Sequence, residues 1–264
     1  MKLFFRHYGE DHHQPMVILH GLFGISDNWV TFGRRIGDYG FNVYIPDQRN
    51  HGNSPHSKEF DYLCMVDDLK QFLEENHIEN PIIIGHSMGG KVAMRFALEY
   101  PEKVKKLVIV DISLRSYPPR FQHQKLIQAM KKINLQAASS RKDIERQLFA
   151  EINNQRLVWF LMKNIKRLQG NRFIWRINLD GILNNLPNMF DGIFTDIQFN
   201  KPSLFIKGGN SDYIQLDDYD DIRHNFPQAE IITIDNTSHW VHAEAPERFF
   251  QLVSGFTWDS GIME

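Results

Sequence analysis

Six short apolar runs limit what this chain can fold into more than any other feature of its sequence. They lie at residues 16–21, 41–47, 80–87, 104–111, 202–209 and 229–235. Most are apolar at consecutive positions instead of alternating with polar residues. Strands of that kind are typical of a parallel sheet that helices cover on both faces. We therefore expect a doubly wound α/β fold with a mostly parallel sheet.

Helical periodicity separates most of these runs, as at residues 63–77 and 91–104. The interval 113–200 breaks this alternation, because it contains three amphipathic stretches and no run that resembles a buried strand. These stretches are QKLIQAMKKINL, RKDIERQLFAEI and QRLVWFLMKNIKRL. Compact domains rarely contain a structureless loop of that length. We therefore expect a helical cap at 113–200, inserted into a core made of 1–112 and 201–264.

Composition excludes several classes of protein. The 264 residues include 30 Lys or Arg and 32 Asp or Glu, which is not the charge balance of a nucleic-acid binder. Cys64 is the single cysteine, so an intrachain disulfide and a thiolate metal cluster are impossible. No apolar run is long enough to predict a membrane span, and the N-terminal one is too short for a secretory signal. We expect a soluble, cytoplasmic protein.

The pentapeptide GHSMG at residues 85–89 is the strongest local signal for chemistry. It stands directly after an apolar run and directly before a helical segment. A serine in this context lies on a sharp, strained turn, and its glycine neighbours let the backbone pass closely. Such a turn exposes the hydroxyl at the carboxyl end of the sheet. Ser87 is therefore the candidate nucleophile.

A histidine late in the chain is the candidate general base for this serine. In folds with this type of turn, the chain order is nucleophile, acid and then histidine. The chain has 12 histidines, so the position of a histidine matters more than its presence. His239 begins the loop that leaves the last predicted strand, whereas His242 lies toward the following helix. We therefore expect His239 to be the base.

The segment HGLFG at residues 20–24 is the candidate site for binding an oxyanion. It follows a predicted strand and supplies a glycine-flanked loop at the same end of the sheet as Ser87. Backbone N–H groups in such loops stabilise the negative charge of a tetrahedral intermediate. We expect the donors to be the amides of Leu22 and Met88, the latter directly after the nucleophile. His20 is expected to brace the loop.

Seven motifs occur in a fixed order along the chain: HGLFG, DQRNHGNSP, GHSMGGK, VDIS, WRINLD, GGNS and SHWVHAE. Together they resemble the α/β-hydrolase superfamily, and specifically its YbfF-type esterases and related abhydrolase-domain proteins. The similarity covers essentially the full chain. It implies a serine esterase or thioesterase that uses no cofactor and no metal, and it makes DQRNHGNSP a structural turn. Ser238 departs from the family, in which Gly usually precedes the histidine.

Two carboxylates compete for the role of catalytic acid. Spacing favours Asp212, because a residue after the seventh strand is typical of the superfamily. The resemblance to YbfF-type esterases points instead to Asp111, with Ser211 in a supporting hydrogen-bonding role. Both carboxylates leave strand ends at the same edge, so either could reach His239. We favour Asp111 and keep Asp212 as the alternative. Asp180, in WRINLD, is a third and weaker candidate that we expect instead to hold the cap in place.

The predicted cap carries a strong positive charge. Residues 115–180 contain fourteen Lys or Arg and four Asp or Glu, a net charge of +10 against −12 for the rest of the chain. This asymmetry could steer an anionic substrate such as an acyl group on coenzyme A, and solvated helix faces explain it as well. Four cap aromatics fit a cap core and could also wall an acyl pocket: Trp159, Phe160, Phe173 and Trp175.

These features predict a serine hydrolase that cleaves carboxylic esters or thioesters, including acyl-coenzyme A, through an acyl-enzyme on Ser87. The expected partner is a small-molecule acyl ester or thioester. No nucleic-acid partner is expected, and the protein is expected to be a monomer or homodimer. Two other functions stay open. One is a lyase or C–C bond hydrolase with the same triad, and the other is a non-catalytic homologue that binds a small ligand.

Overall fold

A computed structural model of the protein describes residues 1–119 and 121–258. Within these residues, seven strands form one sheet in the order β1-β3-β2-β4-β5-β8-β9. The pair β1 and β3 is antiparallel, and all other neighbours are parallel. The strands are β1 (Phe5–Tyr8), β2 (Pro15–Leu19), β3 (Asn42–Pro46), β4 (Ile82–His86), β5 (Lys106–Val110), β8 (Ser203–Gly208) and β9 (Ala229–Ile234).

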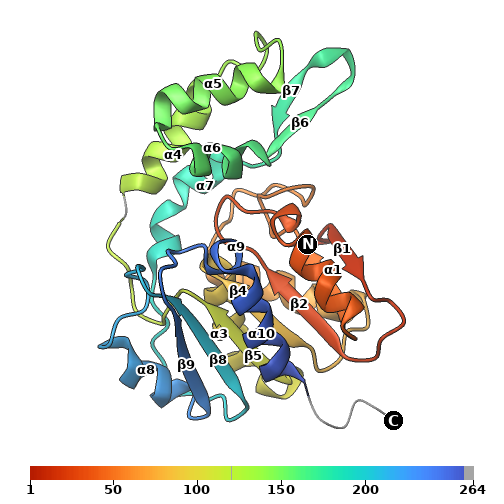
Figure 1. The fold of residues 1–264 in the computed structure, drawn as a ribbon, viewed down its shortest axis with the longest axis vertical. Coiled ribbons are helices and arrows are strands. Elements are labelled where there is room, and N and C mark those ends of the chain that lie inside the picture. The colour runs from red at the N-terminus through yellow and green to blue at the C-terminus, as the bar shows by residue number, and fades with distance from the viewer. Residues whose placement is uncertain (120, 259–264) are drawn as a thin grey trace.

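Helices cover both faces of this sheet, which confirms the predicted fold class. On β4, Ile82 and Ile84 belong to one buried apolar layer and Ile83 belongs to the other, because successive strand residues point to opposite faces. The first layer includes side chains of α1 and α10, and the second includes side chains of α2, α3 and α8 (Figure 1). These helices are α1 (Val30–Asp38), α2 (Tyr62–Glu75), α3 (Met88–Glu99), α8 (Asp218–Asn225) and α10 (Pro246–Thr257).

Each of the six apolar runs overlaps one strand of the sheet. The edge strand β1 was not predicted. Its sequence FRHY is half-buried at every position, so it lacks the apolar run that marks the other strands. It joins the sheet through antiparallel pairing with β3. A strand at an exposed edge needs little apolar surface, which explains why its sequence gives no clear signal.

The residues between β5 and β8, which we call the insert (113–200), lie over the end of the sheet where α9 (Val241–Glu244) also lies (Figure 1). Residue 120 of the insert and residues 259–264 of the predicted core range are outside the described part of the chain. The insert contains α4 (Phe121–Lys132), α5 (Arg141–Ile152), α6 (Gln155–Met162), β6 (Ile165–Arg167), β7 (Phe173–Trp175) and α7 (Leu179–Asn184), and it also contains short 3₁₀ helices.

The third predicted helix of the insert is wrong in its second half. α6 ends at Met162, and the residues that follow form β6, which pairs antiparallel with β7. Asn164 explains the break. Its buried side-chain amide donates to Phe23 O at 2.8 Å, and its backbone carbonyl accepts from Arg176 N at 2.7 Å. These bonds to the core and to the residue after β7 replace the hydrogen bonds that a continued helix would make.

Lys91, in α3, holds the two chain segments that join the insert to the core. Its ammonium donates to Leu114 O at 2.8 Å, to Arg115 O at 2.7 Å and to Asp191 O at 2.9 Å. An ammonium has three N–H donors, so these three carbonyls satisfy it fully. The outgoing and returning segments are therefore fastened at one buried point. No helix in the described residues has the length and apolarity needed to cross a membrane.

Replacing a central strand residue tests how much stability this sheet core supplies. Ile84 is fully buried in β4, whereas Ile232, on β9, is only partly buried. We expect Ile84→Ala to lower the free energy of unfolding by about 2–5 kcal/mol, because it removes packed methylene groups and leaves a cavity. Ile232→Ala, the matched control, should cost clearly less. Urea denaturation of both variants measures the difference, and equal losses would contradict the assigned core.

Candidate active site

Ser87 occupies the strained turn between β4 and α3. Its backbone angles are φ 52° and ψ −118°, a left-handed conformation that residues with side chains rarely adopt. Two glycines make room for this turn. A Cβ on Gly85 would lie 2.4 Å from Gly89 O, and a Cβ on Gly89 would lie 2.4 Å from Leu19 O. Because both obstacles are backbone atoms, a side chain at either position would push the turn out of place.

His239 and Asp111 meet although they lie 128 positions apart in the chain. Nδ1 of His239 is 2.8 Å from Oδ2 of Asp111. Because a carboxylate only accepts hydrogen bonds, we assign the ring proton to Nδ1, and Nε2 is then left to accept a proton. The Asp111 side chain is fully buried, and the His239 side chain is 23% exposed. This geometry favours Asp111 as the partner of the histidine.

Asp111 follows β5 in a left-handed turn with φ 50°. Its Oδ1 accepts a hydrogen bond from Gly208 N at 2.9 Å, and its Oδ2 accepts one from the hydroxyl of Ser211. Both donors stand at the end of β8, so two neighbouring strand ends hold the carboxylate. Asp212 lies beside Ser211 in the lining of the cavity described below, and its backbone carbonyl accepts from Arg115 Nη2 at 2.8 Å.

Leu22 and Met88 contribute two amides at this end of the sheet. A Cβ on the neighbouring Gly21 would lie 3.2 Å from the Cβ of Ser87, so the loop that carries Leu22 passes directly against the serine. Met88 is the first residue of α3, where helix N–H groups lack partners within the helix. Within the described residues, neither amide donates a hydrogen bond. Both are therefore available to an oxyanion.

Two buried histidines brace the loop of residues 20–24. Nε2 of His20 accepts from Gln48 N at 2.9 Å, and Nε2 of His51 accepts from Phe23 N at 3.2 Å. Their Nδ1 atoms then carry protons and donate to the carbonyls of Gly21 and Arg49, each at 2.9 Å. Burial lowers the pKa of His20 to about 4 and that of His51 to about 3. Both rings are therefore neutral at pH 7.

The segment DQRNHGNSP forms the turn that supplies this brace. Asp47 within it accepts backbone N–H bonds from Ser26 at 2.6 Å and from Asn53 at 2.8 Å. These bonds occupy both carboxylate oxygens. Across the described residues, no group of three or more His, Cys, Asp or Glu side chains is arranged to hold a metal ion.

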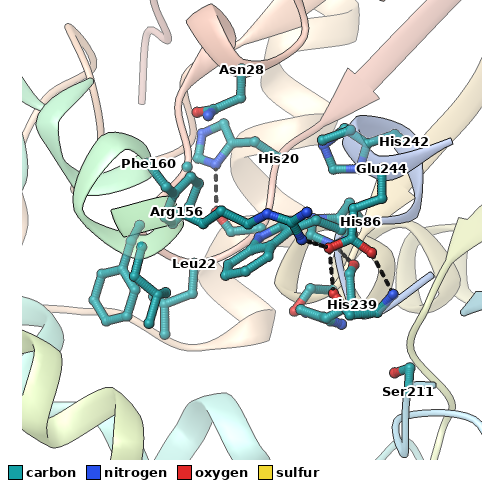
Figure 2. Close-up of a pocket in the computed structure, with 18 of the residues that line it drawn as sticks. His20, Leu22, Asn28, His86, Arg156, Phe160, Ser211, His239, His242 and Glu244 are labelled. Atoms are coloured by element: carbon teal, nitrogen blue, oxygen red, sulfur yellow. Dashed lines mark hydrogen bonds and ion pairs between the residues drawn. The ribbon is translucent and has the colours of Figure 1, made fainter. Parts of the chain in front are cut away.

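A cavity of about 700 Å³ opens between the core and the insert, and Ser87 and His239 both line it. Its walls mix apolar groups with a few charged ones (Figure 2). The insert contributes side chains of α4 and α6, among them Leu126, Leu157, Trp159 and Phe160. Phe173 and Trp175, by contrast, lie in β7. Within the described residues, no hydrogen bond joins the Ser87 hydroxyl to the His239 ring, a contact that often tightens only when substrate binds.

Arg156 of α6 crosses from the insert to the core at this cavity. Its Nη1 lies 2.5 Å from Oε1 of Glu244, in α9 (Figure 2). The same carboxylate accepts from Ser238 N at 2.5 Å and from Ser238 Oγ at 2.9 Å. Ser238, which stands where the family usually has Gly, therefore adds a bond to Glu244. The residue just before His239 is thus tied to the insert.

Part of the positive charge of the insert is paired within the structure. Lys131 forms an exposed pair with Asp180 at 2.5 Å, so Asp180 lies on the surface of the insert and fastens α7 to α4. Other cations that have a carboxylate within 4 Å are Arg115, Lys132, Arg146, Arg156 and Arg176. Three of the partner carboxylates, Asp218, Glu244 and Asp27, lie outside the insert and so reduce the charge open to a ligand below the sequence count of +10.

Two residues at the site were not found from the sequence. The ring of Tyr213 is stacked on the ring of His239, with centroids 3.9 Å apart and planes 20° apart. Glu244 holds the histidine loop as described above. Tyr213 lies two residues beyond the motif GGNS, and Glu244 is the last residue of SHWVHAE, so proximity to these motifs is the available signal. Nothing in residue spacing indicates that an aromatic ring would cover the histidine.

Comparison with known proteins identifies the family of this chain. The alpha/beta hydrolase fold family matches residues 14–246, and the chain belongs to that family. The resemblance seen in the motifs is confirmed, including the branch of YbfF and abhydrolase-domain proteins.

Three similar proteins illustrate this membership. The sn-1-specific diacylglycerol lipase ABHD11 of Danio rerio is 38% identical over 253 residues, which cover 94% of this chain and 80% of that protein. Esterase YbfF of Escherichia coli is 32% identical over 245 residues, which cover 92% and 93% of the two chains. A solved structure, described as a marine microorganism esterase, has a TM-score of 0.92 at 44% identity and covers 97% and 99% of the two chains.

The neutral state of His51 predicts a dependence of stability on pH. Between pH 6.5 and about 3, the unfolded chain binds a proton at this residue and the folded chain does not, so acid favours unfolding. For a fully buried histidine, the free energy of unfolding then falls by about 1.4 kcal/mol per pH unit. We expect His51→Gln to flatten the measured slope between pH 6 and 4 by about that amount. The control is His12→Gln at an exposed position, and equal slopes in both variants would show that His51 is charged when folded.

Proposed function

We propose that this protein is a serine hydrolase that cleaves carboxylic esters through an acyl-enzyme on Ser87. The observation that carries the proposal is the bond between His239 Nδ1 and the buried Asp111, set beside a serine on a strained turn that lines a cavity. Such a trio activates a hydroxyl for attack on a carbonyl. The names of the similar proteins, an esterase and a diacylglycerol lipase, support an ester as the substrate.

In the first half of the reaction, Ser87 Oγ attacks the ester carbonyl carbon while Nε2 of His239 takes the hydroxyl proton. The carbonyl oxygen becomes negative and binds the amides of Leu22 and Met88. One such donor is typically worth about 10²–10³ in rate. When the intermediate collapses, the carbon–oxygen bond to the alcohol breaks. The alcohol leaves with the proton from Nε2, and the acyl group stays on Ser87.

In the second half, water attacks the acyl carbonyl carbon and gives a proton to Nε2 of His239. The bond to Ser87 Oγ breaks, Oγ recovers the proton, and a carboxylic acid is released. Throughout, Asp111 keeps the histidine in one tautomer and stabilises the imidazolium that forms twice per cycle. Each step uses side chains and backbone amides of this chain.

We propose that residues 113–200 act as a cap over a core made of 1–112 and 201–264. The insert supplies one wall of the cavity, and its apolar side chains suit the acyl chain of a substrate. A thioester would pass through the same steps. Pairing of some of the insert's cations weakens the case for a coenzyme A thioester, and the names of the similar proteins favour esters, so we place esters first. A comparison of kcat/KM on matched acyl esters and acyl-coenzyme A decides between them.

Replacing the nucleophile tests the proposal most directly. We expect the wild-type protein to turn over p-nitrophenyl acyl esters and to be labelled by a fluorophosphonate. In Ser87→Ala, labelling should disappear and kcat should fall by a factor on the order of 10⁵. A folded wild type with neither labelling nor turnover would favour a non-catalytic binding protein. Labelling without ester turnover would favour the lyase or C–C bond hydrolase.

Two matched substitutions separate the candidate acids. We expect Asp111→Asn to lower kcat by about 10³–10⁴-fold, because an amide cannot hold the required tautomer of His239. Asp212→Asn should change kcat by less than about threefold, because the carboxylate bonded to His239 is that of Asp111. Steady-state kinetics on one p-nitrophenyl ester measures both. A large loss confined to Asp212→Asn would reverse the assignment.

A further inference from the structure

The aromatic ring of Tyr213 lies flat against the imidazole of His239. Their centroids are 3.9 Å apart and their planes differ by 20°, so the two rings overlap as a stack. Both residues line the cavity. The hydrogen bond to Asp111 holds one edge of the imidazole, and that bond alone allows the ring to swing about the Nδ1 contact. A flat surface against its face removes that freedom.

Tyr213 also belongs to a closed circuit of contacts around the histidine. Its backbone N–H donates to Ser211 Oγ at 3.3 Å. The Ser211 hydroxyl donates in turn to Asp111 Oδ2, the same oxygen that lies 2.8 Å from His239 Nδ1. The stack between Tyr213 and His239 completes the circuit. A displacement of any one of these four residues therefore disturbs the position of the imidazole.

The insert holds the other side of Tyr213. The hydroxyl of Tyr117, near the start of the insert, donates to Tyr213 O at 2.6 Å, and the two rings pack with centroids 5.3 Å apart. Arg115 donates to the neighbouring Asp212 O at 2.8 Å. Lys91 donates to Arg115 O at 2.7 Å and so fixes the segment that carries Arg115 and Tyr117. The tyrosine is thus held in place before any substrate arrives.

We propose that Tyr213 is a positioning residue for His239, and that its ring also stabilises the imidazolium formed during the reaction. The inference rests on the role of His239 in the proposed function. An aromatic face attracts a cation, and the attraction grows where water is excluded. Because the imidazole becomes positive only when it takes the serine proton, the stack favours that step over the resting state. It therefore raises kcat more than it lowers KM.

A set of variants at position 213 separates the ring from the rest of the side chain. Tyr213→Leu removes the stack, whereas Tyr213→Phe keeps the ring and loses only the hydroxyl. We expect Tyr213→Leu to lower kcat about tenfold, with KM changed by less than about threefold, and Tyr213→Phe to stay within about twofold of wild type. Tyr213→Met serves as a second aliphatic variant should Tyr213→Leu fold poorly. Equal losses in Phe and Leu, or an unchanged kcat in Leu and Met, would overturn the proposal.

A spectroscopic measurement tests the same inference without turnover. In the Ser87→Ala protein, the proton between His239 Nδ1 and Asp111 gives a far-downfield NMR signal, which stays sharp while the bond is held away from exchange with water. We expect this signal to remain sharp in Ser87→Ala with Tyr213→Phe and to broaden in Ser87→Ala with Tyr213→Leu. A sharp signal in both would overturn the positioning role. Absence of ester turnover in the wild type would refute the proposed function alone, since this comparison does not depend on it.

Discussion

The crowded turn at Ser87 is the constraint on which the rest of the site depends. A non-glycine residue with φ near 50° costs on the order of 1–3 kcal/mol, so it persists only where its surroundings leave no alternative. Here β4 ends in a hydrogen bond from Ser87 N to Val110 O at 3.1 Å, and α3 begins at the next residue. Backbone atoms then crowd both flanking glycines. The hydroxyl is thus fixed at the sheet edge where the amides of Leu22 and Met88 are also presented.

The neutral imidazoles of His20 and His51 make the loop of residues 20–24 rigid without adding charge to the site. His20 and His51 each accept one backbone N–H and donate to one carbonyl, and burial keeps both uncharged. A charged brace so close to the serine would alter the field in which the oxyanion develops. A lysine could not accept a hydrogen bond, and a carboxylate could not donate one. Histidine therefore suits a loop that must leave the Leu22 amide for the substrate.

The fold was largely predictable because buried strands have apolar residues at consecutive positions, and the sequence has six such runs. The prediction failed where burial is partial, as in β1, and where tertiary bonds override local periodicity, as at Asn164. The positions of Ser87 and His239 follow from local motifs and chain order. The choice between Asp111 and Asp212 does not, because both leave strand ends at the same edge. The stacked Tyr213 lies further out of reach, because a stacking contact depends on the path of a loop in space.

The order of strands explains how these residues come together. Ser87 follows β4, Asp111 follows β5, Tyr213 lies beyond β8 and His239 lies beyond β9, and these four strands are neighbours in that order. The histidine must therefore reach across the end of β8 to bond a carboxylate at the end of β5. The imidazole of His239 therefore lies over the end of β8. A side chain from the loop after β8 is needed there to support its face. Tyr213 lies in the loop beyond β8, so the strand order brings its ring to the face of the histidine.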